Sequence, residues 1–296
     1  MQSGHSRSRA LFVVFIGGVC ISFAPVFVRM LDVTRIGATA IGFWRTLFGA
    51  VILFSLLKIR SKSLTLPAIG YFWAAMAGLA FFVDLFAWHR SIFFCGSGMA
   101  TILGNTQIFG SSILGYFVFK EKLSIRFFLA AVSALVGVAL LAGLGSSSVE
   151  FTERYVLGIF FGLITGIAYA NYIISLKKAG HAIPKLDFVA LIAWMSLFCA
   201  TFLGISTLIE DAPAMPPDAT SWLLLFGLGL VAQSAGWIAI SSALPKLGAS
   251  QAGLVLLIQP TLATIWGVLF FHEYLTGLQA AGAALTLGAI YLGSLK

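Results

Sequence analysis

Long apolar stretches separated by short polar connections make up nearly the whole sequence. A hydrocarbon core of about 30 Å requires about 20 helical residues to cross it. Stretches of that length predict ten membrane-spanning helices, at about 10–30, 38–57, 67–89, 96–119, 124–144, 155–176, 187–208, 219–242, 248–271 and 276–295. The connections leave no room for a soluble domain. The pattern therefore predicts an all-α membrane protein.

Composition agrees with this prediction. Hydrophobic residues make up 60% of the 296 residues and charged residues only 9%, which is too apolar for a water-soluble domain of this size. The formal charge of +8 comes from the connections and not from a basic patch with aromatic or glycine-rich recognition residues. We therefore expect a lipid bilayer around the protein and no nucleic acid bound to it.

Lys and Arg gather on one side of the predicted membrane. With the N-terminus in the cytoplasm, thirteen of the 18 Lys and Arg residues fall on the cytoplasmic side. The other side carries four, namely Arg29, Arg35, Arg90 and Arg154, and Arg45 lies inside a span. Such an excess marks cytoplasmic loops. The sequence thus predicts that both termini are cytoplasmic, and we expect the membrane to be a bacterial cytoplasmic (inner) membrane.

The sequence contains an internal repeat. A shift of 152 residues aligns 96–144 with 248–296 without a gap and with twelve identities. Apolar spans match easily by chance, but Glu121 and Glu273 are among the few charged residues of the chain, and each follows a predicted span at the same offset. This coincidence indicates a duplicated unit.

The repeat divides the chain into a first half, 1–145, a linker, 146–151, and a second half, 152–296. Each half has five predicted spans. Because five is odd, the second half enters the membrane from the opposite side, and a pseudo-two-fold axis in the membrane plane is expected. Inverted repeats recur in secondary transporters, where the two halves move to open the site to one side and then to the other. The repeat therefore predicts a transporter that works by alternating access.

A family resemblance supports this interpretation. The second half reads Ala-Leu-Pro-Lys-Leu-Gly-Ala-Ser-Gln-Ala over 243–252, followed by Gln259-Pro260 and by Gly267 to Glu273-Tyr-Leu-Thr276. The first half repeats this pattern loosely, as Gly96, Gln107, Gly115 and Glu121-Lys-Leu-Ser124, and Phe43-Trp-Arg45 opens the second span. Over essentially its whole length the chain resembles the drug/metabolite transporter superfamily, EamA type.

The resemblance implies ten helices around a central cavity lined by spans 1–4 and 6–9. It also implies carriage of metabolites such as amino acids, often outward, without nucleotide hydrolysis. One departure is that Ile108 stands opposite Pro260, where the family usually has a second proline, so a symmetric kink in the two halves is not expected from this pattern.

Polar residues at membrane depth are the candidate substrate contacts, because hydrocarbon penalises them unless they face protein or water. Together they predict a neutral, hydrogen-bonding and partly aromatic cavity. The candidates are Trp88, Asn105, Gln107, Tyr169, Asn171, Gln233, Trp237 and Gln259. Any one of them is equally consistent with a bridge between helices.

Arg45 and Asp84 are the only charged residues well inside the predicted spans. At about 1.5 Å per residue, both lie about 10 Å below the outer membrane surface. They are predicted to form a charge pair, to share a polar patch or to serve the substrate. Asp84 is also compatible with proton coupling. The alternative is that Arg45 extends to the surface and Asp84 meets water at the cavity mouth.

Other chemistry finds little support in the sequence. The cysteines at 20, 95 and 199 have no paired spacing, and no P-loop or HExxH motif occurs, so we expect no metal, cofactor or enzyme activity. Glu121 and Glu273 precede helix starts at Ser124 and Thr276, which favours a structural capping role. The predicted function is secondary transport, as export, of a small metabolite such as an amino acid or a similar amphipathic solute. A channel or scaffold is the main alternative, and an intramembrane enzyme is a more distant one. Oligomeric state is not predicted.

Overall fold

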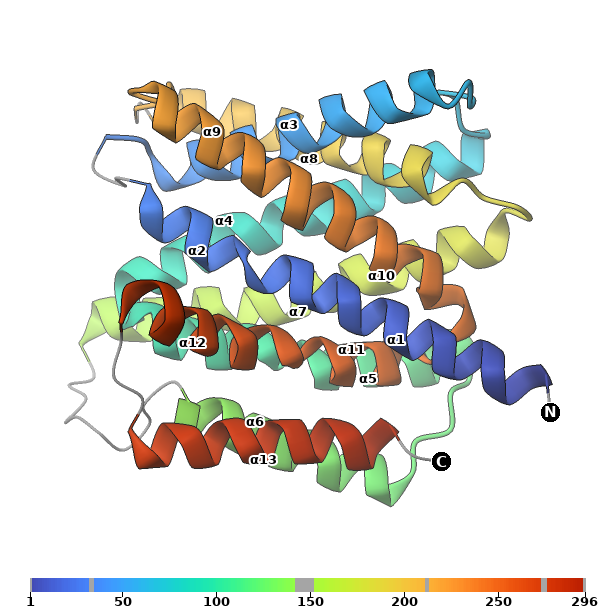
Figure 1. Cartoon of the computed structure of the whole chain (residues 1–296), viewed down its shortest axis with the longest axis vertical. Coiled ribbons are helices and arrows are strands. Elements are labelled where there is room, and N and C mark those ends of the chain that lie inside the picture. Colours follow the sequence, from blue (N-terminus) through green and yellow to red (C-terminus); the bar gives the residue numbers. More distant parts are fainter. Residues whose placement is uncertain (1, 32–34, 142–151, 211–212, 273–275, 295–296) are drawn as a thin grey trace.

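The computed structural model describes residues 2–31, 35–141, 152–210, 213–272 and 276–294, and over these residues it consists of helices and their connections (Figure 1). The predicted first half, 1–145, contains α1 (Gln2–Ser22), α2 (Ala24–Met30), α3 (Ala38–Ile59), α4 (Ala68–Asn105), α5 (Gln107–Phe119) and α6 (Ile125–Leu141). The second contains α7 (Glu153–Ala182), α8 (Phe188–Ile209), α9 (Ala219–Leu228), the π-helix η1 (Gly229–Gly236), α10 (Trp237–Ala243), the 3₁₀ turn η2 (Leu244–Lys246), α11 (Ala249–Leu256), α12 (Ile258–Phe271) and α13 (Gly277–Ser294). The predicted linker and Glu273 lie outside the described residues.

The prediction of an all-helical membrane protein is confirmed. Seven described stretches are long and apolar enough to span a membrane, namely Ser8–Met30, Ala38–Ile59, Ala68–Ile92, Glu153–Ala182, Phe188–Ile209, Ala219–Lys246 and Ala249–Phe271. Two shorter apolar helices cover Ile125–Leu140 and Gly277–Leu292. Large apolar side chains also cover the outside of the bundle, with Phe12, Ile125 and Leu208 63%, 71% and 81% exposed. Lipid is the solvent that tolerates such a surface.

All helices run along one common direction, and both chain ends lie on the same side of the bundle (Figure 1). We call the side at which α1 begins and α13 ends the termini side, and the other the far side. The long helix α4 turns back on itself. A Cβ atom on Gly162 would lie 2.7 Å from Leu103 Cβ and 2.9 Å from Ser91 Oγ, so Ser91 and Leu103 are neighbours in space. In a straight helix, residues twelve positions apart would be about 18 Å from each other. The chain therefore reverses between Ser91 and Leu103.

Several helices are interrupted near the middle of the bundle. Phe23 separates α1 from α2, and Pro25, at the start of α2, has no N–H to donate. Thr106 separates α4 from α5, and Leu257 separates α11 from α12. In η1 the Ser234 hydroxyl bonds the carbonyl of Gly229, five residues back. Interrupted helices at this depth are where transporters place their sites.

Element boundaries recur along the chain. The helices α3 and α8 both have 22 residues and begin at 38 and 188, an offset of 150. The helices α5 and α12 end at 119 and 271, an offset of 152. The next residues, Lys120 and His272, are both left-handed, with φ of 56° and 53°. Their N–H groups donate to the carbonyls of Gly115 and Gly267, again 152 apart.

The main buried core takes most of its residues from α1, α4, α7, α8, α10 and α11, with further residues from α3, α5, α6, α12 and α13. The helices α6 and α13 lie side by side at the edge of the bundle (Figure 1). They approach closely at Gly137, where an added Cβ would lie 2.7 Å from the carbonyl oxygen of Gly282. Neither helix contributes a residue to the cavity described next.

Candidate functional site

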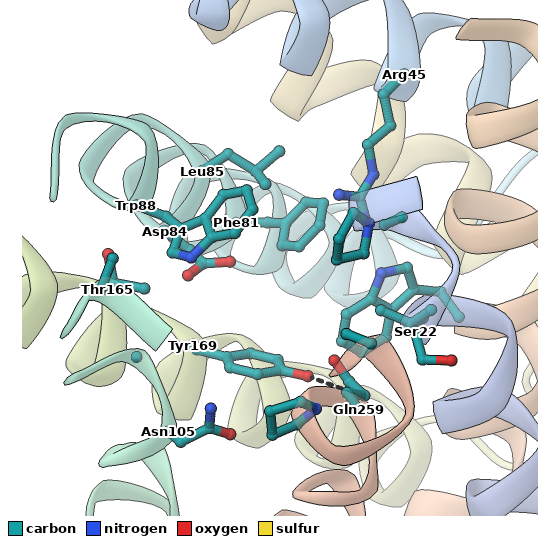
Figure 2. Close-up of a pocket in the computed structure, with 18 residues that line it drawn as sticks. Ser22, Arg45, Phe81, Asp84, Leu85, Trp88, Asn105, Thr165, Tyr169 and Gln259 are labelled. Carbon is teal, nitrogen blue, oxygen red and sulfur yellow. Dashed lines mark hydrogen bonds between the residues drawn. The ribbon is translucent and has the colours of Figure 1, made fainter. Parts of the chain in front are cut away.

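A cavity of about 170 Å³ opens among helices of both halves (Figure 2). Its lining comes from α1, α2, α3, α4, α7, α10 and α12, as Ile21, Ser22, Ala24, Pro25, Arg45, Phe81, Asp84, Leu85, Trp88, Ala100, Gly104, Asn105, Thr165, Tyr169, Trp237, Gln259, Pro260 and Ala263. Pockets for drug-sized ligands start at about 300 Å³. The size of this cavity therefore matches a small solute.

The cavity lies toward the far side of the bundle. Arg45 is seven residues from the far-side start of α3 at Ala38 and fourteen from its end at Ile59. Asp84 is eight residues from Ile92, where the first arm of α4 ends, and sixteen from its start at Ala68. The two charged lining residues thus sit at matched depth, as their positions in the sequence predicted.

Arg45 is held by a chain of hydrogen bonds. Its Nε donates to Gln233 Oε1 at 3.2 Å, and Gln233 Nε2 donates to Ser196 Oγ at 2.9 Å. Its guanidinium carbon lies 5.5 Å from the centre of the Phe81 ring, within cation–π range. Because Nε is engaged behind the site, the terminal nitrogens are left to face the cavity, as Figure 2 shows. Arg45 is therefore an oriented cation in the cavity wall.

Asp84 shares this cavity but does not pair with Arg45. Both residues are 8% exposed, yet within the described ranges no ion pair of 4.0 Å or less joins them. Both side chains line the same cavity, and in the described part of the chain they do not form the direct charge pair that was one of the alternatives from the sequence. A buried carboxylate is costly unless a cation, a donor or water meets it. Asp84 is therefore a candidate partner for a cation, a hydrogen-bond donor or water in the cavity.

Aromatic rings form the wall and the floor of the cavity. Gln259 Nε2 donates to the Tyr169 hydroxyl at 3.1 Å (Figure 2). The ring of Tyr172 meets that of Trp237 edge to face, with the ring centres 4.4 Å apart, and it stacks on the ring of Phe81, with the centres 4.8 Å apart. The Trp237 indole nitrogen is buried and has no hydrogen-bond partner within the described part of the chain. An acceptor atom of a solute would satisfy that nitrogen.

The predicted site residues separate into two groups. Those that line the cavity are Arg45, Asp84, Trp88, Asn105, Tyr169, Trp237 and Gln259. Gln233 lies behind Arg45, and Gln107 donates to the Gly253 carbonyl at 3.1 Å, joining α5 to α11. Asn171 is exposed on the outside of the bundle and donates to the carbonyl of Ile167 at 2.9 Å. The cavity thus has no contact with Gln107, Asn171 or Gln233.

Sequence reasoning also missed lining residues. Thr165, Phe81 and Leu85 line the cavity, but their residue types are ordinary in a membrane helix, so no sequence signal singled them out. Ser22 lies beside the break before Pro25, and its hydroxyl accepts a hydrogen bond from the Trp266 indole at 2.8 Å. Among the described residues no cluster of three or more His, Cys, Asp or Glu side chains has the geometry of a metal site.

Comparison with known proteins finds similar transporters and a similar fold. A probable amino-acid metabolite efflux pump of Salmonella typhimurium is 26% identical over 202 residues, which cover 66% of this chain and 67% of the relative. The uncharacterized transporter YdfC of Bacillus subtilis is 27% identical over 262 residues, 86% of this chain and 80% of the relative. A crystal structure superposes with a TM-score of 0.81 over 97% of this chain and 96% of the other, at 17% identity, which shows a shared fold.

The family model of the EamA-like transporters matches the chain twice, over residues 8–143 and 156–295. These two matches cover nearly the whole sequence, in agreement with the helical membrane architecture and with the resemblance of the motifs. Family membership makes the protein a transporter and not an enzyme. The chain belongs to the EamA-like transporter family.

Proposed function

We propose that the protein is a secondary transporter that exports a small amphipathic metabolite, most simply an amino acid, by alternating access. The observation that carries the proposal is the cavity in which Arg45 and Asp84 face one small space without pairing. The ammonium group of an amino acid complements Asp84, and its carboxylate complements Arg45 and the Trp237 N–H. Its side chain then packs against the aromatic wall. Outward transport rests on the similarity to the protein named as an efflux pump.

Reciprocal contacts support an inverted repeat of ten spans. The Trp44 indole donates to the carbonyl of Ala214 at 2.7 Å, and the Trp194 indole donates to that of Leu64 at 2.7 Å. Both donors and both acceptors are 150 residues apart. A tryptophan of the first half thus contacts the second half in the same way that the equivalent tryptophan of the second half contacts the first. A two-fold axis between the halves requires such reciprocal contacts. The two matches of the family model support the same division at 1–145 and 152–296.

Membrane sidedness gives a first test. In a chain without its native cysteines, Met215→Cys is expected to react with an impermeant maleimide added to intact bacterial cells, and Lys62→Cys is not. The reason is that these connections follow α8 and α3, which cross in opposite directions under the inverted arrangement. Labelling of permeabilised cells is the control that both thiols are reactive. Equal labelling of both variants in intact cells would contradict the inverted ten-span topology with cytoplasmic termini.

Transport itself is tested by counterflow. Purified protein in liposomes loaded with unlabelled phenylalanine is expected to accumulate labelled phenylalanine transiently. The reason is that unlabelled phenylalanine inside occupies the carrier, so labelled molecules that enter are slow to leave. Phenethylamine and 3-phenylpropionate each lack one charged group, so excess of either is expected to compete weakly. A channel gives no counterflow. Absence of counterflow for all common amino acids would refute the proposed substrate class.

A further inference from the structure

Donors from the second half converge on one carboxylate of the first half. Glu121 lies in the connection between α5 and α6, outside both helices. Its Oε1 accepts hydrogen bonds from Lys177 Nζ at 2.5 Å and from the Ala249 N–H at 2.6 Å. Its Oε2 accepts from the Ser250 hydroxyl at 2.8 Å and from the Ser250 N–H at 3.3 Å. We call these four residues the Glu121 cluster.

The cluster is closely packed. Cβ atoms placed on Gly115 and Gly248 would lie 2.9 and 3.0 Å from Glu121 Oε2, so a side chain at either position would press on the carboxylate. Lys177 is 4% exposed and its Nζ lies 4.3 Å from the Phe119 ring. Ala249 and Ser250 begin α11, whose first N–H groups have no partner within the helix. Glu121 therefore caps a helix of the other half.

The charge state favours this contact. Burial raises the pKa of the Glu121 carboxyl, but the hydrogen bonds from Lys177, the Ala249 N–H and Ser250 and the charge of Lys177 outweigh burial, so the pKa lies below its usual value. Glu121 is thus ionised at neutral pH. An anion at a helix N-terminus beside a buried cation is stabilised both by the helix dipole and by the ion pair.

The cluster and the cavity lie at different depths of the bundle. The cavity lies toward the far side, whereas α5 ends and α11 begins on the termini side (Figure 1). Between them lie the cavity-lining Trp237, 1% exposed, and Tyr172, 0% exposed, whose ring is in edge contact with it. Ser111, 0% exposed, lies on α5 between the cavity residue Asn105 and Glu121. Buried side chains therefore separate the cavity from the termini side.

We propose that the Glu121 cluster is the closure of the termini side, which must break for the cavity to open there. The inference rests on the proposed function in one respect, namely that a carrier opens to both sides in turn. The four hydrogen bonds join Glu121 of the first half to α7 and α11 of the second half, so separation of the halves on this side breaks all of them together. No other described acidic side chain contacts the first N–H groups of α11.

Accessibility of a buried thiol tests the closure. In reconstituted protein with Cys20, Cys95 and Cys199 replaced by Ala, Ser111→Cys is expected to react slowly with an impermeant maleimide added on the termini side. Adding Glu121→Gln replaces charge-assisted hydrogen bonds with weaker neutral ones. The reaction rate is expected to rise about tenfold, because the loss of such bonds shifts a two-state equilibrium by about that factor. The matched control is Glu153→Gln, an exposed glutamate on the first turn of α7, which is expected to leave the rate unchanged.

A second variant covers the case in which Glu121→Gln does not fold. Ser250→Ala removes one neutral donor and is expected to raise the rate about two- to fivefold. Elution as a single folded species is required of every variant. An unchanged rate in folded Glu121→Gln or Ser250→Ala protein would overturn the closure. If the rate rises while no solute gives counterflow, the closure stands and the proposed function fails. If counterflow occurs and the rate does not respond, the function stands and the closure fails.

Discussion

Replacing Asp84 with Asn is expected to weaken binding of a zwitterionic amino acid about 10- to 100-fold while the protein still folds. The Asp84 carboxylate lines the cavity and has no ion-pair partner among the described residues, so its charge is available to an ammonium group. A hydrogen bond to a charged group contributes about 1.5–3 kcal/mol, which corresponds to that range in affinity. The half-saturating concentration for counterflow is the measurement, and it is expected to rise in this variant.

The companion change is Arg45→Gln, which is expected to reduce affinity for carboxylate-bearing solutes in the same way. Arg45→Lys keeps the charge but loses the Nε hydrogen bond to Gln233, so part of the affinity is expected to remain. The double variant Asp84→Asn, Arg45→Gln is expected to be worse than either single variant, because the two charges serve different ends of the solute. Recovery in the double variant would instead indicate a structural pair. Loss of pH-driven transport with intact exchange in Asp84→Asn would assign that residue to proton coupling.

The rule that polar residues at membrane depth must face protein or water identified much of the cavity lining. It found Arg45, Asp84 and Gln259, because a charged or amide side chain is costly when it points into lipid tails. It did not distinguish Asn171, which satisfies its amide through the carbonyl of Ile167 on its own helix. It also passed over Phe81, because an aromatic residue is equally at home in lipid. Polarity identifies residues that need a partner, but the partner itself depends on tertiary packing.

The role of Glu121 shows the same limit. A structural role was predicted from the helix start at Ser124, three residues away, whereas the carboxylate caps α11, 128 residues away. Spacing along the sequence can reveal a side chain that caps the helix next to it. It cannot reveal a side chain that caps a helix far away in the sequence. The predicted helix start at Thr276 does carry a local capping contact, because the Gln279 side chain accepts a hydrogen bond from the Thr276 N–H at 3.0 Å. For Glu273 the prediction falls outside the described residues.

The π-helix η1 offers a physical reason why the predicted repeat is visible in only part of the sequence. Gly78 and Gly229 make equivalent contacts at an offset of 151, whereas Gly115 and Gly267 are offset by 152. The residues from Gly78 to Gly115 therefore correspond to those from Gly229 to Gly267, which are one residue longer and contain η1. A π turn takes more residues than an α turn, so it absorbs one extra residue within a helix. Alignment at the single offset of 152 therefore fails before α11.

Gly78→Ala and Gly229→Ala are expected to destabilise the protein by similar amounts, about 1–3 kcal/mol each, as overpacking of a dense interface does. A Cβ on Gly78 would lie 2.8 Å from Phe198 Cβ and 2.9 Å from the Met195 carbonyl oxygen of α8. A Cβ on Gly229 would lie 2.7 Å from Phe48 Cβ and 3.2 Å from the Arg45 carbonyl oxygen of α3. The neighbours Phe48 and Phe198, like Arg45 and Met195, are 150 residues apart.

These two glycines therefore hold equivalent interfaces, and they should respond alike if the halves are structural copies. The measurement is the unfolding temperature of purified protein in one detergent, followed by intrinsic tryptophan fluorescence. Gly288→Ala in α13 is the matched control, because a Cβ there meets nothing within 4 Å, and helix propensity favours Ala by about 1 kcal/mol. Its unfolding temperature is expected to stay the same or rise. Larger side chains at Gly78 or Gly229, such as Leu, are expected to prevent accumulation of folded protein. A pronounced drop for one of the two Ala variants with no change in the other would show that the interfaces are not equivalent, and would remove this support for the inverted repeat.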